Sequence, residues 1–244
     1  MLNVLLIQAR AADDIMAHHE VDCIREKLGM RELNIETHNA VIEPAQVDWL
    51  NQKHLLLIGG SGDFSVHHPL SRPWVEPLHP VLERAISDGI HSLAICFGHQ
   101  LLGEHLGSQV ITDPARAELG TVGMSLTPAG QIDPLFSVLS PSFNAHCGHS
   151  DLVSHVPERV ELMASNQTLD AQGFKVRGTP FYSVQFHPDM TGSEARERYM
   201  AYHGGFSEKL SQDARAYADS FRPGEDEACS LLDRLAALAV EATR

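Results

Sequence analysis

Short apolar runs alternate with amphipathic segments along the first half of the chain, and this alternation constrains the fold more than any other feature of the sequence. The apolar runs span 3–8, 54–58 and 90–95, a half-polar run spans 32–38, and the segments with helical character span 12–27, 77–87 and 98–106. A run that is apolar at every position predicts a strand buried on both faces, as in parallel sheets. The alternation therefore predicts an α/β fold, a three-layer sandwich with a central, mostly parallel sheet.

The pattern changes after Gly107, where short β-like pieces follow one another between turns. These pieces span 109–112, 120–126, 162–165 and 173–176, and an apolar run at 182–186 predicts a further buried strand. The chain has helical character from residue 193 onward, and the segment 225–243 carries an apolar face made of Leu231, Leu232, Leu235, Leu238 and Ala239. We therefore predict one domain over residues 1–192 and a C-terminal helical extension over 193–244 that packs on it.

Composition and charge argue against several classes of function. Acidic residues number 32 and basic residues 18, and the net charge of −14 argues against nucleic acid or an anionic membrane as the main partner. No apolar stretch approaches the roughly 20 residues that a membrane span needs, and the first apolar run lacks the basic flank of a secretion signal. The four cysteines are scattered and form no CxxC pair, which predicts free thiols and a cytoplasmic location.

The segment 93–100 (LAICFGHQ) carries the strongest chemical signal, because a buried strand ends on Cys96 and a helix begins two residues later. Small residues two positions before and after, Ala94 and Gly98, allow strand and helix to approach closely, as in a nucleophile elbow. A helix N-terminus favours the thiolate and directs the backbone N–H of Phe97 toward a developing oxyanion. Taken alone, the same pattern fits a small buried structural cysteine equally well.

Three segments, in this order, resemble the class I (triad) glutamine amidotransferases. They are the glycine turn 59–62 (GGSG), the nucleophile motif 95–102 (ICFGHQLL) and the histidine motif 184–189 (VQFHPD), with a weaker fourth match in 149–151 (HSD) and 164–166 (ASN). The resemblance covers roughly residues 40–192. It implies a flavodoxin-like fold, and it implies that the segment 1–192 is a class I glutamine amidotransferase domain.

The resemblance also implies the catalytic roles. Cys96 would attack the side-chain carbonyl of glutamine, His187 would shuttle the proton, and a γ-glutamyl thioester would form and be hydrolysed. The backbone N–H groups of Gly60 and Phe97 would hold the oxyanion. The third member of the triad would be Asp189, where the family usually has glutamate, so the carboxylate is one methylene shorter. A second departure is the alanine before the nucleophile, where the family usually has glycine.

Substrate-binding residues are likewise expected from the resemblance. Gly59 and Gln100 near the elbow, together with His149, Ser150 and Asp151, would hold the α-amino and α-carboxylate groups of the substrate.

Neither a metal nor a cofactor is expected. The histidine pairs 18–19 and 67–68 and the segment 146–149 (HCGH) lack the spacing of a closed four-ligand zinc site. The glycine turn lacks both the lysine of a phosphate-binding loop and the spacing of a dinucleotide fingerprint.

Three functions remain open at this point. The chain is expected to hydrolyse glutamine, releasing glutamate and ammonia, and the candidate acceptor of the ammonia is a separate synthetase subunit. A γ-glutamyl peptidase would use the same chemistry on compounds such as glutathione, with a larger amine as leaving group. A catalytically inactive regulatory module is the third alternative, and Asp189 is its support. The C-terminal helices are candidates for a homodimer contact.

Overall fold

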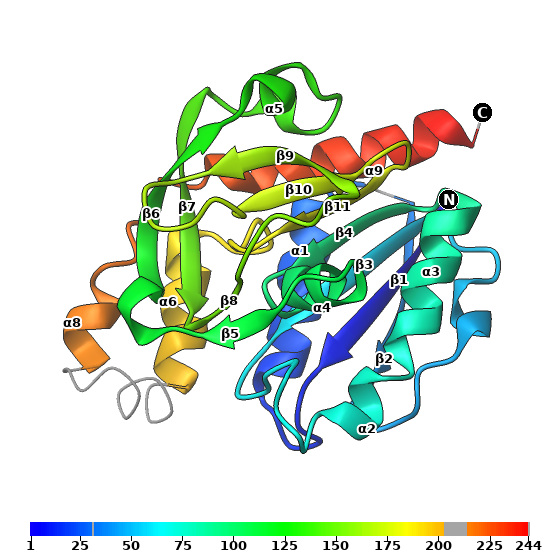
Figure 1. Ribbon diagram of the computed structural model, residues 1–244, viewed down its shortest axis with the longest axis horizontal. Coiled ribbons are helices and arrows are strands. Elements are labelled where there is room, and N and C mark those ends of the chain that lie inside the picture. Colours follow the sequence, from blue (N-terminus) through cyan, green and yellow to red (C-terminus); the bar gives the residue numbers. More distant parts are fainter. Residues whose placement is uncertain (31, 203–213, 244) are drawn as a thin grey trace.

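A nine-stranded sheet runs through the middle of the computed structural model (Figure 1), which describes residues 1–30, 32–202 and 214–243. Its strand order is β2-β1-β3-β4-β11-β10-β9-β6-β7. The first five strands in this order are parallel: β2 (Leu33–Asn39), β1 (Leu2–Ala9), β3 (Leu55–Ser61), β4 (His91–Ile95) and β11 (Phe181–Val184). The other four continue it in antiparallel fashion: β10 (Gly173–Val176), β9 (Val160–Ser165), β6 (Glu118–Leu126) and β7 (Ser142–His149).

Helices cover both faces of the parallel half, because its central strands are apolar on both sides. Leu57 of β3 faces a core shared with α1 (Met16–Lys27) and α9 (Ser230–Ala242). The next residue, Ile58, faces a second core shared with α3 (Leu78–Asp88) and α4 (Phe97–His105). The predicted α/β fold with a central, largely parallel sheet is confirmed.

The remaining elements are short. They are α2 (Arg72–Val75), α5 (Pro128–Ile132), α6 (Gly192–Ala201), α8 (Ala214–Ala218), the 3₁₀ turns Val47–Leu50, Pro114–Arg116, Phe136–Val138 and Glu227–Cys229, and a separate antiparallel pair formed by β5 (Val110–Thr112) and β8 (Asp151–Val153). None of the described helices is both long and apolar enough to cross a membrane.

The helix predicted over 225–243 begins later than expected, since a 3₁₀ turn precedes α9. α9 lies against α1, β1 and β4 (Figure 1), and it buries Leu231, Leu232, Leu235 and Ala239 almost completely. This face is the predicted apolar stripe, with Leu238 at its half-buried margin.

The sequence did not predict β7, although it is one of the longer strands. Its buried positions include His146 and His149, which are polar and therefore obscure the apolar pattern that indicates a strand. Both histidines are buried because each has a carboxylate partner, Asp226 for the first and Glu118 for the second.

Strands β4 and β11 are direct neighbours, and they position the site. Ile95 is paired with Val184 in the parallel register. The carboxyl ends of these strands meet at one edge of the sheet, so the residues that follow them come together although they are far apart in the sequence.

Candidate active site

Cys96 occupies a sharp turn between β4 and α4. Its φ of 51° and ψ of −98° are unusual for a residue other than glycine, and such strain clusters at functional sites. Backbone hydrogen bonds hold the turn on both sides: the N–H of Cys96 donates to Val184 O at 2.9 Å, and the N–H of Gln100 donates to Cys96 O at 3.0 Å. The side chain is 7% exposed and lines a cleft, so it is accessible at the N-terminus of a helix.

Gly98 explains how helix and strand come so close at this turn. A Cβ atom at this position would lie 2.7 Å from the carbonyl oxygen of Ile58 and 3.0 Å from its Cβ. Glycine is therefore required here by the packing of α4 on β3. Ala94, at the other small position, is completely buried in the core on the same side of the sheet.

His187 and Asp189 follow β11 and form a buried pair. Nδ1 of His187 lies 2.9 Å from Oδ1 of Asp189, and Asp189 is 1% exposed. The backbone N–H of His187 donates to the carbonyl of His146 on β7 at 2.9 Å. A carboxylate bonded to Nδ1 fixes the imidazole so that Nε2 is the nitrogen available for chemistry.

Charge within this pair is set by competition between burial and ion pairing. Burial alone lowers the pKa of His187, but the Asp189 carboxylate outweighs it, and a hydrogen bond with Cys96 adds to the rise, to about 9. Burial alone raises the pKa of Asp189, but the charges of His187 and Arg198 hold it far below its usual value. The carboxylate is therefore ionised and the imidazole protonated at neutral pH.

Gly60 lies between the nucleophile and the histidine. A Cβ atom at this position would lie 2.9 Å from Cε1 of His187 and 3.7 Å from Cβ of Cys96. Phe97 is the first residue of α4, and the N–H groups of a first helical turn have no partner within the helix. The two residues expected to form an oxyanion hole thus both lie next to Cys96.

A cleft of about 490 Å³ opens from Cys96 along the loop that follows β3. Four of the five expected substrate-binding residues line it: Gln100, His149, Ser150 and Asp151. Nε2 of Gln100 donates to the carbonyl of Asp151 at 2.8 Å, which ties α4 to this wall of the cleft.

Gly59, the fifth expected residue, does not line the cleft. A Cβ atom at Gly59 would meet Glu20 of α1, on the other side of β3. Its glycine is needed because the buried Glu20 carboxylate, which binds Arg10, occupies that space. We therefore place Gly59 in the packing of β3 against α1 and not in the substrate cleft.

His149 lines the cleft, but both of its ring nitrogens are engaged. Nε2 lies 3.2 Å from Oε2 of Glu118, and Nδ1 lies 3.1 Å from the carbonyl of Asp151. Ligand atoms of Glu118, Cys147 and His149 lie within 4.8 Å of one another, the spacing of a candidate metal centre. Hydrogen bonds from Asn166 and Gln172 also reach Glu118, so its carboxylate is satisfied by protein donors. This group supports the wall of the cleft.

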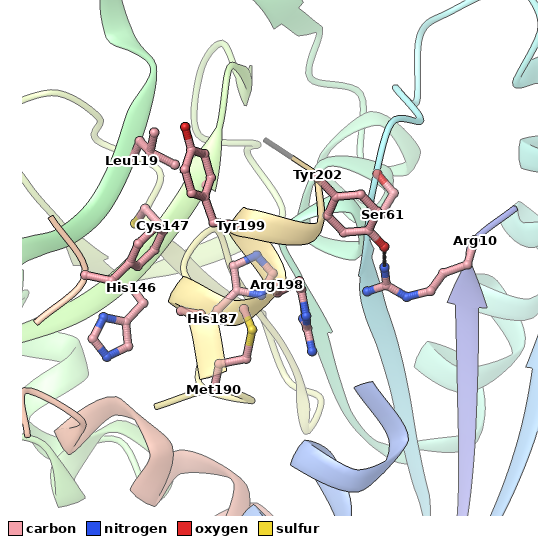
Figure 2. A pocket seen from close by; sticks show the side chains of 13 residues that line it. Arg10, Ser61, Leu119, His146, Cys147, His187, Met190, Arg198, Tyr199 and Tyr202 are labelled. Atoms are coloured by element: carbon pink, nitrogen blue, oxygen red, sulfur yellow. Dashed lines mark hydrogen bonds between the residues drawn. The ribbon is translucent and has the colours of Figure 1, made fainter. Parts of the chain in front are cut away.

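His187 also lines a second, much smaller cavity (Figure 2), which has a volume of about 40 Å³. Its lining combines the aromatic rings of Tyr199 and Tyr202 with the side chains of Arg10 and Arg198. Nη1 of Arg10 donates to the hydroxyl of Tyr202 at 2.6 Å, the dashed contact in Figure 2.

Two side chains at the site were not predicted from the sequence. Nε2 of Gln185 donates to Sγ of Cys96 at 3.6 Å, and Oε1 of Gln185 accepts from Gln100 at 3.3 Å. Its position two residues before His187 on the same strand end was the available signal. Nη1 of Arg198, on α6, donates to Oδ2 of Asp189 at 2.9 Å. No sequence pattern indicates this contact, because it depends on how α6 folds back.

Comparison with known sequences agrees with this geometry. The family model described as glutamine amidotransferase class-I matches residues 21–203. The chain is 30% identical over 122 residues to a protein from Methanocaldococcus jannaschii named as a subunit of a glutamine-hydrolyzing GMP synthase, covering 50% of this chain and 63% of that protein. The subunit of the same name from Sulfurisphaera tokodaii is 29% identical over 138 residues, covering 57% and 69%. The match covers only 24% of the GMP synthase from Cytophaga hutchinsonii.

Solved structures share the fold over nearly the whole chain. A glutamine amidotransferase from Thermotoga maritima superimposes with a TM-score of 0.77 at 20% identity, covering 98% of both chains. One from Methylobacillus flagellatus gives a TM-score of 0.73 at 16% identity, covering 99% of this chain and 95% of the other. The family match over more than half of the sequence, together with this shared fold, shows that the chain belongs to the class I glutamine amidotransferase family.

Proposed function

We propose that the protein hydrolyses the side-chain amide of glutamine to glutamate and ammonia, with Cys96 as nucleophile, His187 as acid and base, and Asp189 as the carboxylate that orients the histidine. One observation carries this proposal. Cys96, held with positive φ at the N-terminus of α4, lies beside His187 across Gly60, and Nδ1 of this histidine binds a buried carboxylate. A structural cysteine has no need of this arrangement.

The first half of the reaction forms the acyl-enzyme. The Cys96 sulfur attacks the side-chain carbonyl carbon, and the carbonyl oxygen becomes an oxyanion that the N–H groups of Gly60 and Phe97 stabilise. His187 donates its Nε2 proton to the amide nitrogen, the carbon–nitrogen bond breaks, and ammonia leaves. The γ-glutamyl thioester of Cys96 remains.

The second half restores the enzyme. Nε2 of His187 takes a proton from a water molecule, whose oxygen attacks the thioester carbon. The carbon–sulfur bond then breaks, glutamate is released, and Cys96 departs as the thiolate beside a protonated His187. Asp189 keeps the imidazole in one orientation through both halves, because Nδ1 stays bonded to its carboxylate.

The named relatives favour glutamine as the substrate. The proteins from M. jannaschii and S. tokodaii are named as subunits of a glutamine-hydrolyzing GMP synthase. The cleft of about 490 Å³ that Cys96 lines is large enough for other γ-glutamyl compounds as well, so the γ-glutamyl peptidase is the alternative that the experiment must exclude.

The experiment is a comparison of substrates with matched variants. Purified protein is incubated with glutamine, glutathione and other γ-glutamyl amides while glutamate and ammonia are measured. We expect release from glutamine, none with Cys96→Ala, and normal release with Cys229→Ala, a cysteine outside both cavities. Turnover of glutathione without turnover of glutamine would replace this proposal by the peptidase. No release from any substrate, with Cys96 unlabelled by a glutamine-like electrophile, would favour the inactive module.

We also propose that a separate synthetase subunit receives the ammonia, in the cytoplasm. The support is that the relatives from M. jannaschii and S. tokodaii are named as subunits of a GMP synthase. The match spans about two thirds of the length of those subunits, so their activity is carried over as a proposal only.

A further inference from the structure

Arg198 reaches the candidate triad from the C-terminal part of the chain. It lies on α6, is 6% exposed, and donates from Nη1 to Oδ2 of Asp189 at 2.9 Å, while Oδ1 of the same carboxylate faces His187. The Asp189 carboxylate is thus held by one cation at each oxygen. Charge-assisted bonds of this kind are stronger and more directional than neutral ones.

The surroundings indicate that the charge of Arg198 is directed at this carboxylate. Nη2 of Arg198 lies 3.4 Å from Nδ1 of His19 on α1. Burial and the neighbouring guanidinium lower the pKa of His19, so this ring is neutral and can accept that bond. Nε of Arg198 is buried and has no hydrogen-bond partner among the described residues. A buried guanidinium with one unpaired donor is costly, and the bond to Asp189 is what offsets that cost.

We propose that Arg198 is a positioning residue for the reaction: it clamps the short Asp189 side chain in the place where His187 needs it, and it draws part of the carboxylate's charge away from the imidazolium. This rests on the proposed function. The side chain of Asp189 is one methylene shorter than the glutamate usual in the family. Only one of its oxygens faces His187, and the bond from Arg198 to the other oxygen restricts the rotation of the carboxylate. Sharing the carboxylate also keeps His187 acidic enough to protonate the leaving ammonia.

Several titratable groups face this chain of contacts and must be considered together. The groups that face His187 are Cys96 before α4, His146 of β7 and Asp189. The groups that face Arg198 are His19 and Cys23 of α1, Asp189, and Tyr202 just after α6. Asp189 is hydrogen-bonded to both His187 and Arg198, so Arg198 acts on the histidine through this carboxylate.

The test compares Arg198→Met and Arg198→Lys with Arg196→Met, a change to an exposed arginine of the same helix that pairs with the exposed Asp219. We expect kcat for glutamine to fall about 10- to 100-fold in Arg198→Met, as for a misplaced catalytic group. The alkaline limb of the pH profile, which is the fall in activity as His187 loses its proton, should move to higher pH. The reason is that the Asp189 carboxylate then interacts with the imidazolium alone. Arg198→Lys should lie between Arg198→Met and the wild type, and Arg196→Met should match the wild type.

A second background shows whether Arg198 acts through the carboxylate. In Asp189→Asn, adding Arg198→Met should change kcat and the alkaline limb much less than in the wild type. Folded Arg198 variants whose alkaline limb stays at the wild-type pH, or equal effects in both backgrounds, would overturn the proposal. If Arg198→Met does not fold, Arg198→Lys alone decides by the same criterion.

A readout without substrate separates this inference from the proposed function. Iodoacetamide alkylates the thiolate of Cys96, so the alkylation rate changes with pH as the thiolate–imidazolium pair gains or loses its proton. Peptide mass spectrometry identifies Cys96 as the alkylated residue. A protein that releases no glutamate from glutamine would defeat the proposed function. The positioning role would then stand or fall on whether Arg198→Met moves the pH dependence of alkylation while Arg196→Met does not.

Discussion

At the scale of single residues, the site joins one nucleophile to a row of charged side chains. Cys96 lies beside His187, His187 is hydrogen-bonded to Asp189, and Asp189 to Arg198, so that charges alternate from the imidazolium outward. Each buried charge is paired with an opposite one, which is the condition under which ionised groups are tolerated in a protein interior. The raised pKa of His187 is the direct result, and it predicts how activity depends on pH.

We predict that kcat/KM for glutamine falls as the pH rises through about 9, because His187 then loses the proton that the leaving ammonia needs. Asp189→Asn should move this limb to lower pH, since removal of the carboxylate removes the main cause of the raised pKa. It should also lower kcat by about two to four orders of magnitude. Activity within a few-fold of wild type, with the limb unmoved, would show that Asp189 is not part of the triad.

The same raised pKa links the site to stability. His187 binds its proton more tightly in the folded chain than in the unfolded chain, so its contribution is complete below pH 6.5 and is lost as the pH rises to about 9.

At the scale of elements, the strand–turn–helix unit was predictable and the antiparallel half of the sheet was only partly so. The runs before Cys96 and His187 are apolar throughout, and Gly98 marked the close approach of α4, so residue types alone located the elbow. The strand β7 was missed because its buried histidines are stabilised by Glu118 and Asp226, partners that are far away in the sequence. Arg198 was missed for the same reason.

The elbow gives the prediction at this scale. Gly98→Ala should destabilise the fold by about 1–3 kcal/mol, because the new methyl group meets the backbone of Ile58, which cannot move without shifting β3. The measurement is urea unfolding. Gly123→Ala in β6 is the matched control, since its Cβ would meet only Asn144 Oδ1 at 3.8 Å. Equal unfolding midpoints for Gly98→Ala and wild type would contradict this account of the turn.

At the scale of the whole molecule, the part beyond residue 192 contributes side chains to both the core and the candidate site. α9 covers the sheet beside α1, and α6 supplies Arg198, Tyr199 and Tyr202 to the cavity next to His187. The sequence predicted a helical extension packed on the domain but gave no sign that it reaches the site. We therefore treat the boundary at 192–193 as a division of the sequence and propose that both parts fold as one unit.

This proposal predicts the effect of a single change in α9. Leu235 is completely buried in the core shared with β3 and β4, so Leu235→Ala should cost about 2–5 kcal/mol of unfolding free energy. Leu238→Ala, at the half-buried margin of the same helix, should cost clearly less. A single unfolding transition that shifts as a whole, followed by circular dichroism and by tryptophan fluorescence, would support one unit. Loss of helical circular dichroism ahead of the fluorescence change of Trp49 and Trp74, which lie outside α9, would contradict it.

The pairing of β4 with β11 determines when, during synthesis of the chain on the ribosome, Cys96 gains its neighbours. The ribosome makes Cys96 before His187 with a gap of 187 − 96 = 91 residues, which at about 5–20 residues per second amounts to roughly 5 to 18 seconds. During that interval the nascent thiol has neither its histidine nor the strand that holds the turn. The sulfur gains its proposed partner only when β11 pairs with β4. A nascent chain that lacks β11 therefore has no histidine to activate Cys96, and we expect the thiol to become reactive only when the sheet is complete.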